Sequence, residues 1–490
     1  MSRPPNLLFI FTDEQRYDTM GAYDNHRIET PNLDRLASQS VVFERAYVTQ
    51  SVCTPSRSSI MTGLYPHSNG CIENNIALPD EIPCLPEIVA PGTYTTAYHG
   101  KWHLGDEIFG QHGFDEWRSI EDNYAQYYSK GRDRDARSTY HEWLVENGFE
   151  PRNGRTFGRG EAARLPEAFS KPAYLAQEAS RYIREHQREP FILYVNYLEP
   201  HMPFYGPRDD QYDPAEVALP PDFDARPDKD QPLKTRLFER FYFERGHSGL
   251  PLQTEADWRR MIANYWGLCS LVDTHVGTIL DTLTDCGLDE DTIVVYTSDH
   301  GDMMGSHHLL AKCVNYEEAV RVPLIIRLPG QQHAARVEAP VSQIDLLPTL
   351  LDLLGQPVPE NLEGTSLRPY IEGHAEAPPR DVFLEWNGHN NGLGDVIGQV
   401  SIPEPLLEMA ARDEIIAAIT DPVRTILTPD GWKLNCSPRG EHELYNLNDD
   451  PFETQNLAGT ERAPLMQALA DRIRRWQERT GDTVTLPSHF

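Results

Sequence analysis

Short continuous apolar runs recur along the chain, and each run stops at polar or charged residues. Strands that are buried on both faces of a parallel sheet have this pattern, because neither face of such a strand meets water. The pattern therefore predicts strands over residues 6–12, 41–48, 95–99, 191–198, 292–297 and 322–328.

Segments with helical spacing of their apolar residues lie between these runs. They predict helices over residues 31–36, 56–64, 85–90, 173–187, 258–283 and 345–354. Strands that alternate with helices favour an α/β domain. Two polar, irregular stretches, residues 106–170 and 205–256, interrupt the alternation, and we expect them to form the walls of a substrate site.

The pattern changes near residue 375. Short strand-like pieces separated by Gly, Asn and Asp are typical of hairpins, and they are followed by a last amphipathic segment. They predict strands over 382–386, 423–428, 432–437 and 443–447 and a helix over 464–480. We therefore predict a large α/β domain over residues 1–374 and, over 375–490, a C-terminal α+β subdomain with a small antiparallel sheet and a covering helix. Residues 387–422 give no clear pattern.

Composition narrows the classes of function. The chain has 490 residues and a formal net charge of −31, so nucleic-acid binding and docking on anionic membranes are not expected. The first residues lack the apolar length of a signal peptide, and no segment reaches the length of a membrane span. The seven Cys show no zinc-binding or paired spacing. We therefore expect a cytoplasmic protein with reduced thiols.

Polar groups follow three of the predicted strands. Asp13 and Glu14 follow the first run, His201 follows the fourth, and Asp299 and His300 follow the fifth. Because parallel strands end at one edge of a sheet, we expect these side chains to meet there. Three carboxylates with imidazole favour a hard divalent cation over structural zinc. The alternatives are an acidic cap for the turn after the first strand and a solvated histidine.

The segment 51–63, SVCTPSRSSIMTG, is a second candidate site. Pro55 pushes the residue before it out of the helical region, so we expect the helix to begin at residue 56, with Cys53 just ahead of its N-terminus. A helix N-terminus lowers a thiol pKa, which predicts a reactive cysteine. On residue type alone, a small buried apolar Cys is the commoner case.

Segment 100–105, GKWHLG, places Lys101 and His103 on either side of Trp102. In an extended segment two such side chains can face the same pocket. The alternative is that Lys101 is an ordinary solvent-exposed lysine.

Together these motifs resemble the type I sulfatases of the alkaline phosphatase superfamily. The matching segments are Cys-x-Pro-x-Arg at 53–57, the run 62–66, and 6–18, 100–105, His201, 298–312 and 443–457. The resemblance implies a large mixed sheet sandwiched by helices, with the smaller antiparallel sheet and helix at the C-terminus. It also implies a sulfuric ester hydrolase that converts a small-molecule sulfate monoester to an alcohol and inorganic sulfate.

The resemblance also implies roles for individual residues. Cys53 would be converted to formylglycine by the formylglycine-generating enzyme, and its metal-bound hydrate would be the nucleophile, held by Arg57. One divalent metal, Ca²⁺ first and Mn²⁺ or Mg²⁺ as alternatives, would be bound by Asp13, Glu14, Cys53, Asp299 and His300. The sulfate group would be surrounded by Lys101, His103, His201 and Lys312. A homo-oligomer is possible within the same resemblance.

Two positions depart from the family pattern and bear on the metal. Glu14 stands where Asp or Gln is common, and its side chain is longer by one methylene. His300 stands where arylsulfatases often have Asn, and imidazole in place of amide alters the preference between Ca²⁺ and Mn²⁺.

The implied chemistry uses both hydroxyls of an aldehyde hydrate. One attacks sulfur and expels the alcohol, and proton loss from the other then releases sulfate. Asp299 is expected as the base, and His201 or His103 as the acid. The rival enzyme is a phosphonate monoester hydrolase or phosphodiesterase of the same superfamily, in which Tyr and Thr tend to replace Lys101 and His103. A catalytically idle binding protein is the alternative from another class, and the presence of Cys53, Arg57 and Asp299 argues against it.

Overall fold

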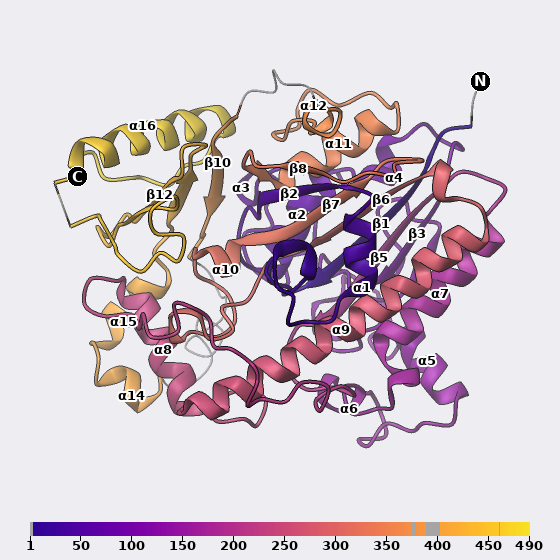
Figure 1. The fold of residues 1–490 in the computed structure, drawn as a ribbon, viewed down its shortest axis with the longest axis horizontal. Helices are drawn as coiled ribbons and strands as arrows, with labels where there is room; N and C mark the ends of the chain where they lie inside the picture. The colour runs from indigo at the N-terminus through magenta and orange to yellow at the C-terminus, as the bar shows by residue number, and fades with distance from the viewer. Residues whose placement is uncertain (1–2, 374–378, 389–401, 460) are drawn as a thin grey trace.

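Strand β1 (Asn6–Asp13) lies inside a mixed sheet, and all of its residues are buried. The computed structural model describes residues 3–373, 379–388, 402–459 and 461–490 (Figure 1). The other strands of this sheet are β2 (Val41–Tyr47), β3 (Thr95–Gly100), β4 (Glu116–Arg118), β5 (Phe191–Pro200), β6 (Thr292–Ser298), β7 (Arg321–Arg327), β8 (Ala335–Val337) and β9 (Val341–Ser342). Their order is β4-β3-β5-β1-β6-β7-β2-β8, with β9 also beside β2.

Direction within the sheet decides where the strand ends meet. β1 pairs in parallel with β5 on one side and β6 on the other, and β5 pairs in parallel with β3. β7 runs antiparallel to both β6 and β2, so the sheet is mixed. Four neighbouring strands thus bring their carboxyl ends to the same edge.

The helices of this part of the chain lie on both faces of the sheet and at its periphery. They are α1 (Pro31–Ala37), α2 (Cys53–Thr62), α3 (Pro66–Asn69), α4 (Leu85–Ile88), α5 (Thr139–Glu146), α6 (Arg159–Ala162), α7 (Lys171–Glu185), α8 (Leu233–Arg245), α9 (Glu255–Asp285), α10 (Glu317–Val320), α11 (Leu346–Leu353) and α12 (Arg368–Ile371). Phe9 of β1 belongs to the apolar cluster that contains α2 and α11, whereas its neighbours Leu8 and Ile10 belong to the cluster that contains α7 and α9. Alternate side chains therefore enter different cores, which is why the strand sequence is apolar throughout.

The C-terminal part forms a second, antiparallel sheet. It consists of β10 (Val382–Glu385), β11 (Arg424–Leu427), β12 (Trp432–Cys436) and β13 (Glu443–Asn446), in that order. Helix α16 (Ala463–Thr480) covers one face of it, and Trp476 stacks on Phe383 with ring centroids 5.2 Å apart (Figure 1). Helices α14 (Glu404–Leu407) and α15 (Arg412–Ile419) lie in the stretch that the sequence left unassigned, next to α8.

The predicted fold class is confirmed: a large mixed sheet between helices is followed by a small antiparallel sheet with a helix. The predicted domain boundary at 374/375 lies outside the described residues. One helix start was predicted wrongly. Helix α2 begins at Cys53 rather than at residue 56, because Pro55 falls in the first turn, where a missing N–H costs no helical hydrogen bond.

No helix among the described residues combines the length and the apolar character that a bilayer-crossing segment needs.

Candidate active site

The carboxyl edge of the four parallel strands collects polar side chains. In the β1–β6 ladder Thr12 lies opposite Ser298, so Asp13 and Asp299 leave the sheet side by side. In the β3–β5 ladder Gly100 lies opposite Asn196. A Cβ at Gly100 would lie 1.9 Å from the Asn196 carbonyl oxygen, so only glycine lets the chain turn here and direct Lys101 into the site.

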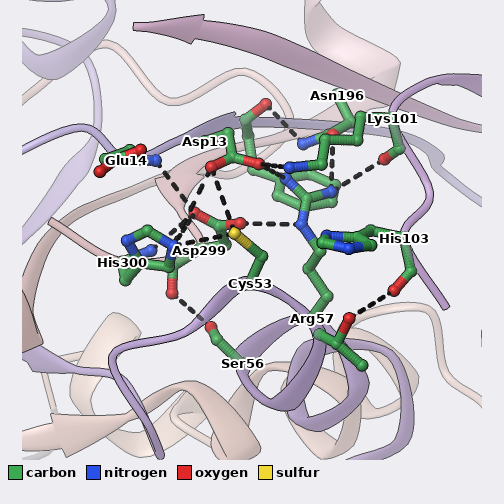
Figure 2. A network of polar contacts seen from close by, with 12 residues as sticks. Asp13, Glu14, Cys53, Ser56, Arg57, Lys101, His103, Asn196, Asp299 and His300 are labelled. Carbon is green, nitrogen blue, oxygen red and sulfur yellow. Dashed lines mark hydrogen bonds and ion pairs between the residues drawn. The ribbon is translucent and has the colours of Figure 1, made fainter. Parts of the chain in front are cut away.

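Helix α2 places Cys53 at this edge. All of its residues are buried, and Cys53 occupies its first position, with Val52 as the N-cap. The Cys53 Sγ atom lies 3.6 Å from Asp13 Oδ1 and 3.3 Å from His300 Nε2 (Figure 2). The helix N-terminus adds a favourable field for negative charge at this atom.

Two hydroxyl groups anchor α2 to the loops around it. Thr54 Oγ1 donates to the His103 carbonyl oxygen at 2.8 Å, and Ser56 donates to the Asp299 carbonyl oxygen (Figure 2). The Ser and Thr side chains of this short helix thus bind it to loops that are distant in the sequence.

Arg57 connects the site. Its side chain is 1% exposed, and it donates to Asp299 Oδ2 at 2.8 Å and to Asp13 Oδ2 at 2.7 Å. Its Nη1 donates to the Lys101 carbonyl oxygen at 2.8 Å and to Asn196 Oδ1 at 2.7 Å (Figure 2). One guanidinium therefore fixes both carboxylates beside Cys53, a task that suits its rigid fork of donors.

The donor set beside Cys53 fits a divalent cation. Ligand atoms of Asp13, Cys53, Asp299 and His300 lie within 4.8 Å of one another, as do those of Asp13, Glu14 and His201. Among the described residues, no donor meets the buried Glu14 Oε1 atom, and the buried Asp302 carboxyl lies beside Glu14, so acidic oxygens are concentrated where a cation would bind. Oxygen ligands with one imidazole suit Ca²⁺, Mn²⁺ or Mg²⁺, and an oxygen on residue 53 in place of sulfur fits such an ion better.

Charges in the site shift the pKa values of these groups. Burial raises the pKa of Asp13, but Lys101, His201 and Arg57 outweigh it and hold that pKa well below its usual range. Burial raises the pKa of Glu14 to about 8, against the attraction of Lys312.

His300 and Cys53 are shifted as well. Burial lowers the pKa of His300, but Asp299 outweighs it, and the value rises to about 9. Burial and Asp13 raise the pKa of the Cys53 thiol, yet Lys101, Lys312 and His300 leave it lowered overall. The charges around position 53 thus favour a negatively charged atom there.

The predicted sulfate-binding residues converge on the same place. Lys101 is fully buried and pairs with Asp13, which excludes the surface alternative, and Lys312 Nζ donates to Glu14 Oε2 at 2.8 Å. His201 Nε2 lies 3.4 Å from Glu14 Oε2. His103 has φ +59° and its Nε2 faces Asn75 Oδ1 at 3.0 Å.

A cavity of about 670 Å³ opens over Cys53, Lys101 and Lys312. The two polar stretches that interrupt the α/β pattern supply much of its wall, as expected. Residues 106–170 contribute Tyr124 and Arg159, and residues 205–256 contribute Tyr242 and Arg245 among others. A volume of this size is typical of sites for small organic ligands.

Sequence reasoning missed several residues that hold the site together. Asn196 bonds Arg57, and Asn75 faces His103. Glu107 accepts the backbone N–H groups of Trp102, at 2.9 Å, and of His103. A polar Asn inside the apolar run 191–198 was a visible signal for Asn196. Nothing in the sequence pointed to Asn75 or Glu107.

Comparison with known proteins supports one family. The sulfatase family model matches residues 5–356. The chain is 31% identical over 464 residues to the sulfatase YidJ of Escherichia coli (strain K12), covering 92% of this chain and 83% of that protein. It is 28% identical to a choline-sulfatase of Rhizobium meliloti (strain 1021), over 96% of this chain and 85% of that protein.

Solved structures agree on the fold. The phosphonate monoester hydrolase of Silicibacter pomeroyi superimposes with a TM-score of 0.77 at 24% identity, covering 97% of this chain and 96% of that one. At this identity the likeness shows the architecture alone. The match of the family model over most of the chain, with the sulfatase relatives, establishes that the chain belongs to the sulfatase family and is a sulfuric ester hydrolase.

Proposed function

We propose that this protein hydrolyses a sulfate monoester with a formylglycine made from Cys53 as the nucleophile and one divalent cation, Ca²⁺ first, at Asp13, Glu14, Asp299 and His300. The observation that carries the proposal is the position of the Cys53 Sγ atom. It lies at the N-terminus of a buried helix, within contact of Asp13 and His300, and faces a cavity lined by Lys101 and Lys312.

Formylglycine, as its hydrate, would supply one hydroxyl for attack on sulfur and a second whose proton loss allows sulfate to leave. A bound divalent cation would act as a Lewis acid and offset charge on the sulfate oxygens. Cys53 is only 2% exposed, so the formylglycine-generating enzyme is expected to act on the chain before it folds.

The protein's own groups would prepare the sulfate for attack. Lys101 and Lys312 are buried cations whose pKa values are raised, the first mainly by Asp13 and the second by Cys53 and Glu14, after opposing effects of burial. They remain charged and are held in place before substrate arrives. Preorganised charge of this kind stabilises charge that develops in a transition state.

Proton transfer falls to histidine in this proposal. Burial and nearby cations hold the pKa values of His103 and His201 well below the usual range, so both are neutral in the free site. A bound sulfate ester brings negative charge, which raises the pKa of a neighbouring imidazole and lets it act as an acid. Both histidines line the cavity, so either can serve as the acid to the leaving oxygen. Asp299 is the proposed base, although its oxygens already accept from Arg57 and from the backbone of Glu14 and His300.

The decisive experiment is mass spectrometry of the peptide that spans Cys53, combined with turnover of sulfate esters. Active enzyme should carry an aldehyde there, so the residue has lost one sulfur and two hydrogens and gained one oxygen. Cys53→Ala should fold with unchanged far-UV circular dichroism and hydrolyse nothing. Active enzyme with an unmodified thiol would overturn the nucleophile, and preferential turnover of phosphonate monoesters would overturn the substrate class.

A further inference from the structure

The wall of the active-site cavity has an unusual charge balance for so acidic a protein. The chain carries a formal net charge of −31, yet none of the described residues lining this cavity is Asp or Glu. Lys101 and Lys312 lie beside Cys53 and are accounted for by the sulfate group. Two further cations, Arg159 and Arg245, line the cavity from the two excursions. A sulfate group alone does not require them.

Arg159 belongs to a cluster with an excess of positive charge. Glu121 receives both Arg159 and Lys171, so one carboxylate faces two cations. Burial raises the pKa of Glu121, but these two cations lower it to about 2, so this carboxylate is ionised. A second carboxyl near both cations, Glu199, has its pKa raised to about 7 by burial, so it only partly offsets their charge near pH 7. The Arg159 Nη2 atom donates to the Tyr124 hydroxyl at 2.6 Å, which fixes the guanidinium at the wall.

Arg159 is linked to the reacting groups through the cavity wall, which Arg159, Tyr124 and His103 all line. Tyr124, which Arg159 holds, packs against His103 with ring centroids 4.6 Å apart. Tyr124 therefore contacts both His103 of the sulfate pocket and Arg159, and a ligand that packs on Tyr124 lies near both.

Arg245 is the other wall cation that a sulfate group does not require. It is exposed at the end of α8, and its guanidinium lies over Phe241 at 5.1 Å from the ring centroid. Among the described residues it makes no hydrogen bond or ion pair, whereas Arg240 on the same helix pairs with Glu244 at 2.9 Å. Within the part of the chain that the structure describes, the donors of Arg245 are thus available at the cavity.

We infer that this cavity takes sulfate esters of a ring-bearing alcohol that carries a second negative charge, such as a carboxylate or another sulfate, and that Arg245 and Arg159 recognise this charge. The inference rests on the proposed sulfate-ester hydrolysis and specifies its substrate class. Tyr124, Tyr127 and Tyr242 offer the flat surfaces on which a ring packs. The acidic global field repels such a substrate, which is why local cations are needed at the wall. The ionised side chains of the cavity wall are lysines and arginines, so they repel the ester of a cationic alcohol.

The test compares three aryl sulfates that differ only at the position para to the sulfate: a carboxylate, a carboxamide and a trimethylammoniomethyl group. Sulfate release gives kcat/KM for each. A partly exposed charge-assisted contact predicts that the carboxylate exceeds the carboxamide by about five- to tenfold, and that the cationic ester falls below both. Added salt should reduce the carboxylate-to-carboxamide ratio, because the contact is screened.

Variants at two positions assign the effect to the wall. Arg245→Ala should bring the carboxylate-to-carboxamide ratio close to one, Arg245→Lys should restore part of it, and Arg159→Lys should reduce it. Arg240→Ala is the matched control on the same helix and should keep the ratio of the unmodified enzyme. A cationic ester that equals or exceeds the carboxylate, or a ratio that survives Arg245→Ala and Arg159→Lys, overturns the inference.

Failure of the reaction itself gives a different result. If none of the three aryl sulfates is hydrolysed but the corresponding aryl methylphosphonate monoesters are, the proposed sulfate-ester reaction is wrong. The kcat/KM values of aryl methylphosphonate monoesters with the same three substituents then show the charge preference of the cavity independently of the reacting group.

Discussion

Replacing Arg57 by lysine tests whether one guanidinium organises this site. The native side chain makes four hydrogen bonds, two to the carboxylates of Asp13 and Asp299 and two to neutral oxygens of Lys101 and Asn196. A lysine ammonium has its three donors at one point and cannot reach both carboxylates and both neutral oxygens.

The magnitude follows from the contacts that are lost. If lysine keeps one charge-assisted bond and one neutral bond, it loses one of each kind, which is about 2–4 kcal/mol of folding free energy. Because unfolding entropy scales with chain length, this lowers Tm of a chain of this size by roughly 2–4 °C. Activity should fall further, by about 10²–10³ in kcat/KM, since preorganised groups around the developing charge are misplaced.

Arg424→Lys is a closely matched control. Arg424 is also 1% exposed, binds Asp482 through two bonds of 2.8 Å, and donates to the Trp386 carbonyl oxygen and to Asn387 Oδ1. It lies in the C-terminal sheet, so its loss should lower Tm similarly and leave kcat/KM within about threefold of the unmodified enzyme by the usual size of remote effects. Scanning calorimetry and initial rates on both variants decide the matter. Arg57→Lys with kcat/KM within tenfold of the unmodified enzyme, or equal activity losses in the two variants, would refute the organising role.

Three further predictions concern charge. Lys312→Ala should lower kcat/KM for sulfate esters by about 10²–10³, as single-donor losses do, with a Tm change too small to explain it; a loss below threefold in initial rates would place Lys312 outside the pocket. Protons compete with the cation for Glu14 and His300, whose pKa values are raised to about 8 and about 9. The Ca²⁺ affinity measured by calorimetry should therefore weaken as pH falls from about 9 toward 6. An affinity that does not change over this pH range would exclude both residues as ligands. Glu121 has its folded-state pKa lowered from 4.5 to about 2, so its contribution, of order 3 kcal/mol, is complete above about pH 4.5 and is lost as pH falls toward 2. The Tm deficit of Glu121→Gln should therefore be about half as large near pH 3 as at pH 7, and an equal deficit at both would contradict the assignment.

The sequence alone indicated the order of the long buried strands and of the main helices, although it missed elements such as β4, α5 and α8 in the two polar stretches. Hydrophobic periodicity is a local property, and runs such as 6–12 and 292–297 are apolar because both faces of their strands are buried. It also placed Asp13 and Asp299 at strand ends, and parallel pairing is enough to bring such ends together. Motif spacing then indicated Cys53 as the reactive position.

Tertiary structure decided how these groups are held. Helix α2 is fixed in the site by side-chain contacts such as that of Thr54 with the distant loop at His103, which no local rule contains. The partners of Arg57, including Asn196, and the position of Arg245 at the cavity likewise depend on register and packing between segments far apart in the chain. The local sequence pattern therefore indicates the secondary-structure elements and the reacting residue. The electrostatic field and the cavity wall around that residue arise only when segments distant in the sequence pack together.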